Sequence, residues 1–301
     1  MKGKGIFVLA AAVAVFGWLP AVSALAMETT IRQATGSPFL PSEIGEVIFQ
    51  IPGQDDRHIF IIGHSHRSAR TGANGNYTIR AQAEVYRIGE WLIRKENVQL
   101  LLPEGFFKRR PTAEVVAGAP AKGALVQTAA LDHQVLVEKL SDTSVFVNAD
   151  MLLRANYQIQ LHQVEDAEIY QAVSRFLHLA DDMRDTHLAG LLDLELDFLQ
   201  EVRSAAMLQN IPDAVEFELQ TGNIDNRRAM FTVGMAHVDE IIRFLREGQI
   251  AISPPSMTFD SYQEHRALLK LIKEGYGVTV ILPRSLVDNQ EALRLANLNN
   301  I

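Results

Sequence analysis

The 301-residue sequence contains no cysteine, and this absence excludes several classes of protein. Without thiols the chain cannot form a disulfide scaffold, a cysteine-ligated zinc site or an iron–sulfur cluster, and it has no cysteine nucleophile. Glycine and proline are modest in number, at 19 and 11 residues, while 48% of the residues are hydrophobic. This composition excludes a collagen-like or wholly disordered chain and predicts a well-buried core.

Positive charge is scarce, and the formal net charge is -8. Such a chain is disfavoured as a nucleic-acid-binding or polybasic membrane-surface protein. Long apolar runs are also scarce, because only residues 6–19 form one. We therefore expect no nucleic-acid partner, and no stable membrane span once that run is removed.

Residues 1–26 have the layout of a secretory signal peptide. Lys2 and Lys4 precede the apolar run, and residues 24–26, Ala-Leu-Ala, supply a small-x-small cleavage site. We expect cleavage before Met27 and a protein that is periplasmic or secreted. The alternative is an N-terminal anchor that is not cleaved.

Apolar runs of strand length alternate with helical periodicity along the rest of the chain. Strands are expected near residues 46–52, 58–63, 98–102, 144–148, 158–164, 230–233 and 277–282, and helices near 78–95, 125–140, 168–210 and 238–247. This alternation predicts a single α/β domain over residues 27–301, with a mainly parallel central sheet flanked by helices and a helical insertion at about 168–228. The runs on either side of residues 53–56 also predict a hairpin.

Polar residues close four of the expected strands. They are His64 and His66, Glu104, Glu165 and Asp166, and His237. Sites in α/β sheets form outside the carboxyl ends of the strands, so we expect several of these side chains to converge on one rim. Because a buried charge is costly unless it is paired, the repetition over four strands favours a functional explanation.

Three imidazoles and two or three carboxylates suit a divalent metal with an activated water, or general acid–base catalysis without metal. His64 and His66 point to the same side of an extended chain, a spacing suited to two imidazoles that share one ion. The ligand types favour zinc, manganese, cobalt or iron. Each of these residues, taken alone, also has a structural explanation. His66 could be a hydrogen-bonded structural residue, Glu104 could cap the segment that follows it, and Glu165 with Asp166 could cap the next helix.

Two arginines are candidates for binding an anionic group of a substrate, namely Arg109 and Arg227. Exposed, solvated arginines are the alternative. Residues 106–123 follow Glu104 and lose hydrophobic periodicity, which predicts either a loop that moves over the site or a fixed surface loop.

Two Gly-x-x-His motifs, Gly63–His66 and Gly234–His237, bracket Glu104, and a helix and a Gly-Tyr-Gly-Val segment follow the second motif. Over residues 58–283 the pattern resembles the superfamily that joins TraB and TIKI proteins to ChaN-like and erythromycin-esterase-like proteins. That family commonly places an Arg-Asn pair on a helix before the second motif, and the nearest candidates here are Asn226 and Arg227.

The resemblance implies that His66, Glu104 and His237 form an active site, often with a divalent metal. We therefore predict an exported metal-dependent hydrolase that acts on a peptide or ester bond of a small-molecule or peptide substrate, with His64 as a further metal ligand. The superfamily also contains a haem-binding protein, so the alternative is a haem- or iron-binding protein of the ChaN-like type without catalysis. A third possibility is a catalytically inactive scaffold.

Overall fold

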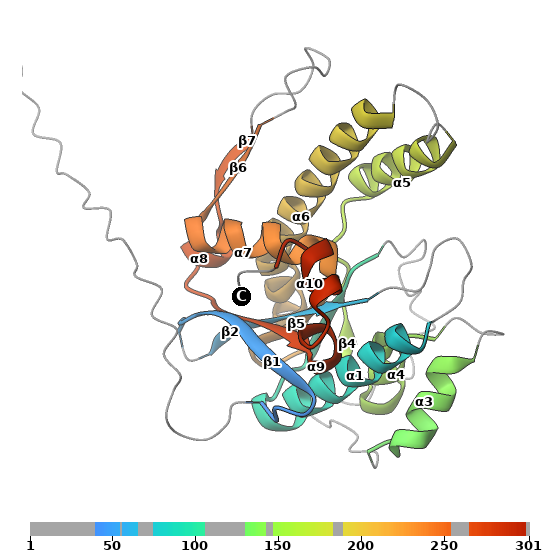
Figure 1. Cartoon of the computed structure of the whole chain (residues 1–301). Helices are drawn as coiled ribbons and strands as arrows, with labels where there is room; N and C mark the ends of the chain where they lie inside the picture. The colour runs from blue at the N-terminus through green and yellow to red at the C-terminus, as the bar shows by residue number, and fades with distance from the viewer. Residues whose placement is uncertain are drawn as a thin grey trace, which may run out of the picture. The chain divides into compact units, whose positions relative to one another are not determined.

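A six-stranded sheet organises the part of the chain that the structure describes (Figure 1). The computed structural model describes residues 40–54, 56–65, 75–105, 130–142, 147–182, 189–253 and 265–298, all within the compact unit Ser37–Ile301. The expected signal peptide, His66, and the expected lid with Arg109 lie outside these residues.

The sheet has the strand order β1-β8-β2-β5-β3-β4. Its strands are β1 (Gly45–Ile51), β2 (Arg57–His64), β3 (Leu100–Pro103), β4 (Gln160–Leu161), β5 (Arg227–Gly234) and β8 (Gly277–Pro283). All neighbouring pairs are parallel except β1 with β8. The predicted mainly parallel α/β fold is therefore confirmed.

Helices cover both faces of this sheet (Figure 1). One face carries α1 (Asn76–Glu96), α3 (His133–Ser141) and α4 (Ala149–Tyr157), and the other carries α5 (Ala167–Asp182), α6 (Ala189–Gln220) and α7 (Val238–Glu247). The shorter elements are η1 (Met235–His237), α8 (Lys270–Lys273), α9 (Arg284–Val287), α10 (Gln290–Leu295), and the separate antiparallel pair β6 (Gln249–Ile252) and β7 (His265–Leu268). No helix of the described segments is both long and apolar enough to cross a membrane.

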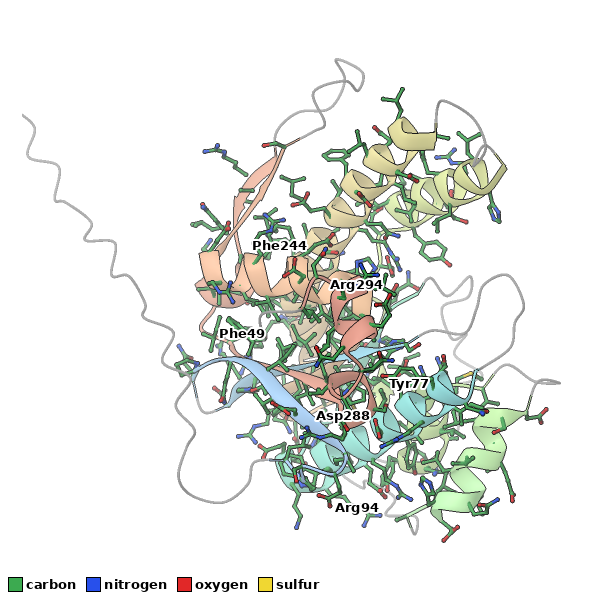
Figure 2. The ribbon with its side chains drawn as sticks, in the orientation of Figure 1. Phe49, Tyr77, Arg94, Phe244, Asp288 and Arg294 are labelled. Carbon is green, nitrogen blue, oxygen red and sulfur yellow. The ribbon has the colours of Figure 1, made fainter. Side chains whose placement is uncertain are left out.

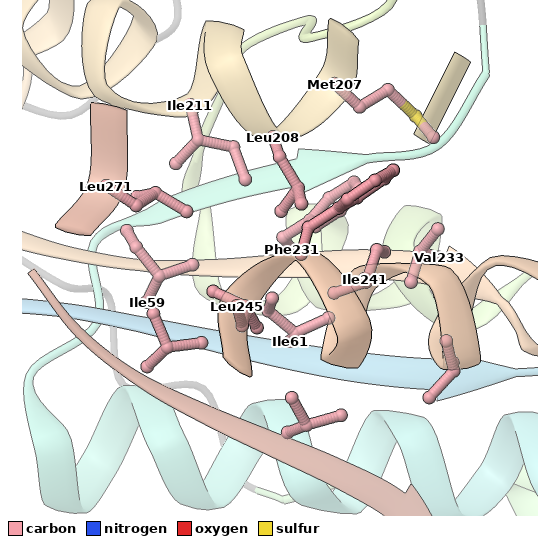
Figure 3. Close-up of a cluster of buried hydrophobic side chains, with 14 of the residues drawn as sticks. Ile59, Ile61, Met207, Leu208, Ile211, Phe231, Val233, Ile241, Leu245 and Leu271 are labelled. Carbon is pink, nitrogen blue, oxygen red and sulfur yellow. The ribbon is translucent and has the colours of Figure 1, made fainter. Parts of the chain in front are cut away.

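Each face of the sheet has its own hydrophobic cluster, because a strand buried on both faces alternates its side chains between them. Ile59 and Ile61 of β2 belong to the α6 and α7 cluster, whereas Phe60 and Ile62 belong to the α1 cluster. Figure 3 shows the first cluster between the sheet and the helices α6 and α7.

Figure 2 shows Arg94 at the end of α1, where its guanidinium donates to the Tyr157 hydroxyl at 3.0 Å.

The predicted hairpin around residues 53–56 is wrong, because β8 lies between β1 and β2. Every residue of β8 is buried, so this strand is stable only in the interior of the sheet, with a partner on each side. The backbone of Gly53 passes so close to that of Gly277 that a Cβ atom on Gly53 would lie 1.8 Å from the Gly277 nitrogen. The link therefore goes around the start of β8 instead of forming a tight turn.

Two local elements also differ from the expectation. Residues 149–157 form α4, which the sequence pattern did not predict, and Asn148 caps it by accepting from the Met151 N–H at 2.9 Å. The strand expected at 158–164 is only two residues long, as β4. Its short pairing with β3 is sufficient to place the following residues beside the end of that strand.

The helical insertion between β4 and β5 consists of α5 and α6, which pack against each other. Helix α6 has 32 residues and continues through Pro212. Its buried residues Met207, Leu208 and Ile211 pack on the sheet (Figure 3). The insertion is therefore part of the main core as well as a connection.

We expect Gly53→Ala to destabilise the protein by roughly 3 kcal/mol, because the added methyl group would collide with backbone that cannot move aside without separating β8 from its neighbours. Urea unfolding of the variant beside the wild type measures this change. Gly190→Ala is the matched control, since no described atom outside its own helix backbone and its chain neighbours lies within 4 Å of the position that its added methyl group would take, and α6 should gain up to about 1 kcal/mol. Equal stability of the two variants would contradict the close approach.

Candidate functional site

The carboxyl ends of β2, β5 and β3 lie side by side, because these strands are adjacent and parallel. The chain leaves β2 toward α1 on one face of the sheet and leaves β5 toward α7 on the other. The boundary between these two strands is therefore a topological switch point, which is where ligands bind in open α/β sheets. His64 and Gly234 face each other in the register at this point.

Glu104 connects the end of β3 to the end of β5. Its backbone N–H donates to the Thr232 carbonyl at 2.8 Å, and its Oε2 accepts from the Gly234 N–H at 2.5 Å. Its Oε1 lies 2.8 Å from Arg203 Nη2 and 3.5 Å from His237 Nε2. The carboxylate thus contacts the backbone of the second Gly-x-x-His motif and two cationic side chains.

His237 lies in η1, directly after β5, and only 3% of its surface is exposed. Its Nδ1 is 2.7 Å from the Ser204 hydroxyl, and its Nε2 is 3.3 Å from Arg203 Nη1. Burial alone would lower the pKa of His237, and the Arg203 charge acts in the same direction. The carboxylates of Glu104 and Glu240 outweigh both effects and raise the pKa to about 9. The imidazole is therefore protonated at neutral pH.

Arg203 of α6 is the centre of the cluster. Its guanidinium binds Glu104 and also binds both oxygens of Glu165, with Nε at 3.0 Å and 3.2 Å from them. Burial opposes its charge, but hydrogen bonds and ion pairs with Glu165 and Glu104 raise the pKa of Arg203. The Tyr170 ring lies 5.5 Å from the guanidinium carbon.

The charges of the buried groups balance, with two carboxylates, Glu104 and Glu165, and two cations, Arg203 and His237. The partly exposed Glu240 adds a third carboxylate, 3.9 Å from Nδ1 of His237. Balance matters here, because the side chains of Glu104 and Arg203 are each only 8% exposed and that of Glu165 is fully buried. Desolvated charges are stable only when they are paired and hydrogen-bonded. We define the four buried residues, Glu104, Glu165, Arg203 and His237, as the rim cluster.

The rim cluster joins three of the residues singled out in the sequence, namely Glu104, Glu165 and His237. Asp166, beside Glu165, instead caps α5 by accepting from the N–H groups of residues 168 and 169 at 2.9 Å and 3.0 Å. Glu165 also accepts from the Gly105 N–H at 3.2 Å. Of these two adjacent residues, Glu165 therefore belongs to the rim cluster and Asp166 caps a helix.

His64 lies on the other face of the sheet from Glu104. It continues the alternation of Phe60 and Ile62 toward α1, and its Nδ1 is 3.2 Å from the amide nitrogen of Gln82 on that helix. Glu104 instead faces α6 through Arg203. The expectation that His64 shares an ion with the other ligands receives no support from these contacts.

Arg227 is far from the rim cluster, because it begins β5 and the cluster lies beyond the end of that strand. Its guanidinium pairs with Glu216 and lies 3.4 Å from Asp56. Arg227 is therefore not part of the rim cluster, and its interpretation as a substrate-binding residue stays a prediction.

Three residues of the site were missed in the sequence: Arg203, Ser204 and Glu240. The available signal was an Arg-Ser pair inside the apolar part of α6, between buried Leu199 and Ala205. An arginine in that position requires a carboxylate partner. Its distance along the chain from Glu104 and Glu165 conceals which carboxylates it meets.

In the part of the chain that the structure describes, no group of three or more histidine, aspartate or glutamate side chains is arranged to hold a metal ion. The only pair of expected metal ligands that meet there is His237 with Glu104, and Arg203 is paired with Glu104 and lies 3.3 Å from the imidazole Nε2. A metal site at this rim would need His66 and a rearrangement of the guanidinium.

We expect Arg203→Met to destabilise the protein by about 3–5 kcal/mol, since it leaves two buried carboxylates without their counter-charge. Urea unfolding at neutral pH measures the loss. Arg175→Met replaces an exposed arginine of α5 and should change stability by less than about 0.5 kcal/mol. A small effect in both variants would show that Arg203 does not carry the charge balance.

The raised pKa of His237 predicts a pH-dependent contribution to stability. Because the folded value of about 9 lies above the unfolded value of 6.5, the contribution is complete below about pH 6.5 and is lost as the pH rises through about 9. We expect the stability difference between wild type and His237→Gln to fall by about 3 kcal/mol between about pH 6 and about pH 10. Urea unfolding of both proteins measures it, and a pH-independent difference would contradict the protonated imidazole.

The candidate site is identified by its geometry alone. The chain matches no family model, no curated protein sequence and no solved structure.

Proposed function

We propose that the rim cluster is the active site of a hydrolase that cleaves a peptide or ester bond. The observation that carries this proposal is the meeting of His237, Glu104 and Arg203 at the carboxyl ends of β5 and β3, with Nε2 of the imidazole facing both a carboxylate and a guanidinium. An acid–base group, a carboxylate and an anion-binding group are the components that acyl transfer to water requires.

His237 is suited to be the general acid. It is protonated at neutral pH, and the leaving amine or alkoxide of the substrate needs a proton. The same imidazole, after giving up its proton, is held by the Ser204 hydroxyl on Nδ1, so its orientation is kept through the reaction. The proton that the base takes from the attacking water then restores the imidazolium, so the proton transfers balance over one turnover.

Arg203 is suited to stabilise negative charge on the substrate. A guanidinium offers five N–H donors, and Nη1 of Arg203 lies 3.3 Å from His237 Nε2. A carbonyl oxygen that becomes negative in the transition state would be stabilised there. Glu165 holds the guanidinium by its other nitrogens and fixes its orientation.

Glu104 has two possible roles in this proposal, general base or metal ligand. Its Oε1 faces His237 and Arg203, while the Gly234 N–H holds Oε2. In the metal-dependent form, His66 would join His237 and Glu104 as ligands, and the divalent ion would supply a water of lowered pKa. In the metal-free form, Glu104 would take the proton from water.

The family resemblance supports the same assignment. The second Gly-x-x-His motif contributes His237, and Glu104 lies where the resemblance expects the catalytic carboxylate. The family commonly places an Arg-Asn pair on a helix well before that motif; Arg203 lies on such a helix but is followed by Ser204, whereas Arg227 begins β5.

We expect His237→Asn and Glu104→Gln to lower hydrolysis of a panel of peptide and ester substrates by at least about 100-fold, since each removes a group that handles a proton. Circular dichroism and urea unfolding confirm that the variants are folded. His178→Asn is the matched control, because His178 is exposed on α5 and should retain full activity. Undiminished turnover in folded His237→Asn would overturn the proposal.

Elemental analysis of the wild type beside His66→Ala and His237→Ala distinguishes the metal-dependent form of the proposed hydrolysis from the metal-free form. Metal-dependent hydrolysis predicts stoichiometric metal in the wild type, loss from both variants, and loss of turnover on chelation. Equal metal content in all three proteins removes the metal-dependent form. Full activity after exhaustive chelation leaves acid–base catalysis through Glu104 and His237.

A further inference from the structure

His237 has a second set of contacts, on the side of the ring opposite Glu104. Its Nδ1 lies 2.7 Å from Oγ of Ser204, which is fully buried in α6. That hydroxyl donates to Oε2 of Glu240 in α7 at 2.5 Å. The direct distance from Nδ1 to Glu240 is 3.9 Å, so the serine is the bridge between the two.

The proton count of the serine fixes the direction of these bonds. A hydroxyl has one proton to donate and two lone pairs that accept. Ser204 has two acceptors within reach, the Glu240 carboxylate and the Gln200 carbonyl at 3.0 Å, and the bond to the charged group is the stronger. Its proton is therefore committed, and Oγ accepts from the Nδ1–H of His237.

Because the Ser204 proton is given to Glu240, the imidazole ring of His237 is held at one nitrogen, Nδ1. With Nδ1–H directed at Ser204, Nε2 faces Arg203 at 3.3 Å and Glu104 at 3.5 Å. A rotation of the ring would break the bond to the serine and would place a carbon beside the guanidinium. The charged groups that face the ring are thus Glu104 from β3, Arg203 from α6 and Glu240 from α7.

We propose that Ser204 and Glu240 form a positioning pair, which holds His237 by Nδ1 and presents Nε2 to the substrate. This inference rests on the proposed role of His237 in hydrolysis. Neither residue needs to touch the substrate, and Ser204 is not a nucleophile in this arrangement, because its hydroxyl is fully buried and its proton is engaged by Glu240. Glu240, with 24% of its side chain exposed, connects the buried ring to the surface.

The test reads the ring itself and does not depend on a substrate. In protein labelled with 15N-histidine, the Nδ1–H of His237 should give a slowly exchanging signal, which is assigned by its loss in His237→Gln. We expect Ser204→Ala to abolish this signal or to accelerate its exchange more than about tenfold. Glu240→Ala should act in the same direction, whereas Glu240→Gln, which retains an acceptor oxygen, should preserve the signal.

Glu247→Ala is the matched control, because it removes an exposed acid from the last turn of the same helix. If Ser204→Ala does not fold, the partly exposed Glu240 decides the question through its two variants. An unchanged His237 signal in folded Ser204→Ala or in Glu240→Ala overturns the positioning pair. Labelling of Ser204 by a fluorophosphonate, detected by mass spectrometry, also overturns it, since it would show a reactive nucleophile.

The kinetic arm separates this inference from the proposed function. With an active wild type, Ser204→Ala should lower kcat by about ten- to a hundredfold and leave KM within about twofold, as expected for a residue that orients a catalytic group. A wild type inactive on the whole panel counts against the hydrolase alone, while the ring signal still decides the pair. An unaltered kcat in Ser204→Ala overturns the pair and leaves the hydrolase intact.

Discussion

The ion pairs of Arg203 are the interaction on which the rest of the site depends. A guanidinium that is almost fully buried is stable only with anions around it, and Glu104 and Glu165 supply them from the ends of two strand segments. The same pairing prevents two buried carboxylates from repelling each other. Through these contacts one side chain of the helical insertion joins the segments that follow β3 and β4, and its guanidinium lies 3.3 Å from His237.

The architecture of the sheet could be predicted from the sequence because its apolar runs are unambiguous. β2, β5 and β8 are buried throughout their second halves, and such runs are typical of strands that are covered on both faces. The order of the strands in the sheet was harder to predict from the sequence. Two runs joined by a short polar link look the same whether they pair directly or leave room for a third strand, and the burial of β8 decides between these outcomes.

The site was partly predictable for a related reason. Parallel strands bring their carboxyl ends together, so Glu104 and His237 could be placed on one rim from their positions in the chain. The face of the sheet was harder to predict, and it separates His64 from them. Arg203 could not be paired with its partners at all, because a helical periodicity says which side of α6 is buried but not what lies opposite.

The long separation along the chain between Arg203 and Glu104 has a consequence for biosynthesis. Glu104 is made well before the helix that neutralises it, and β5, which carries the chain to His237, is made later still. Contacts of such wide sequence separation form late in folding, after the local helices and strand pairs. In a nascent or partly folded chain these carboxylates therefore lack their buried counter-charge, and the rim cluster is complete only when β5 has entered the sheet.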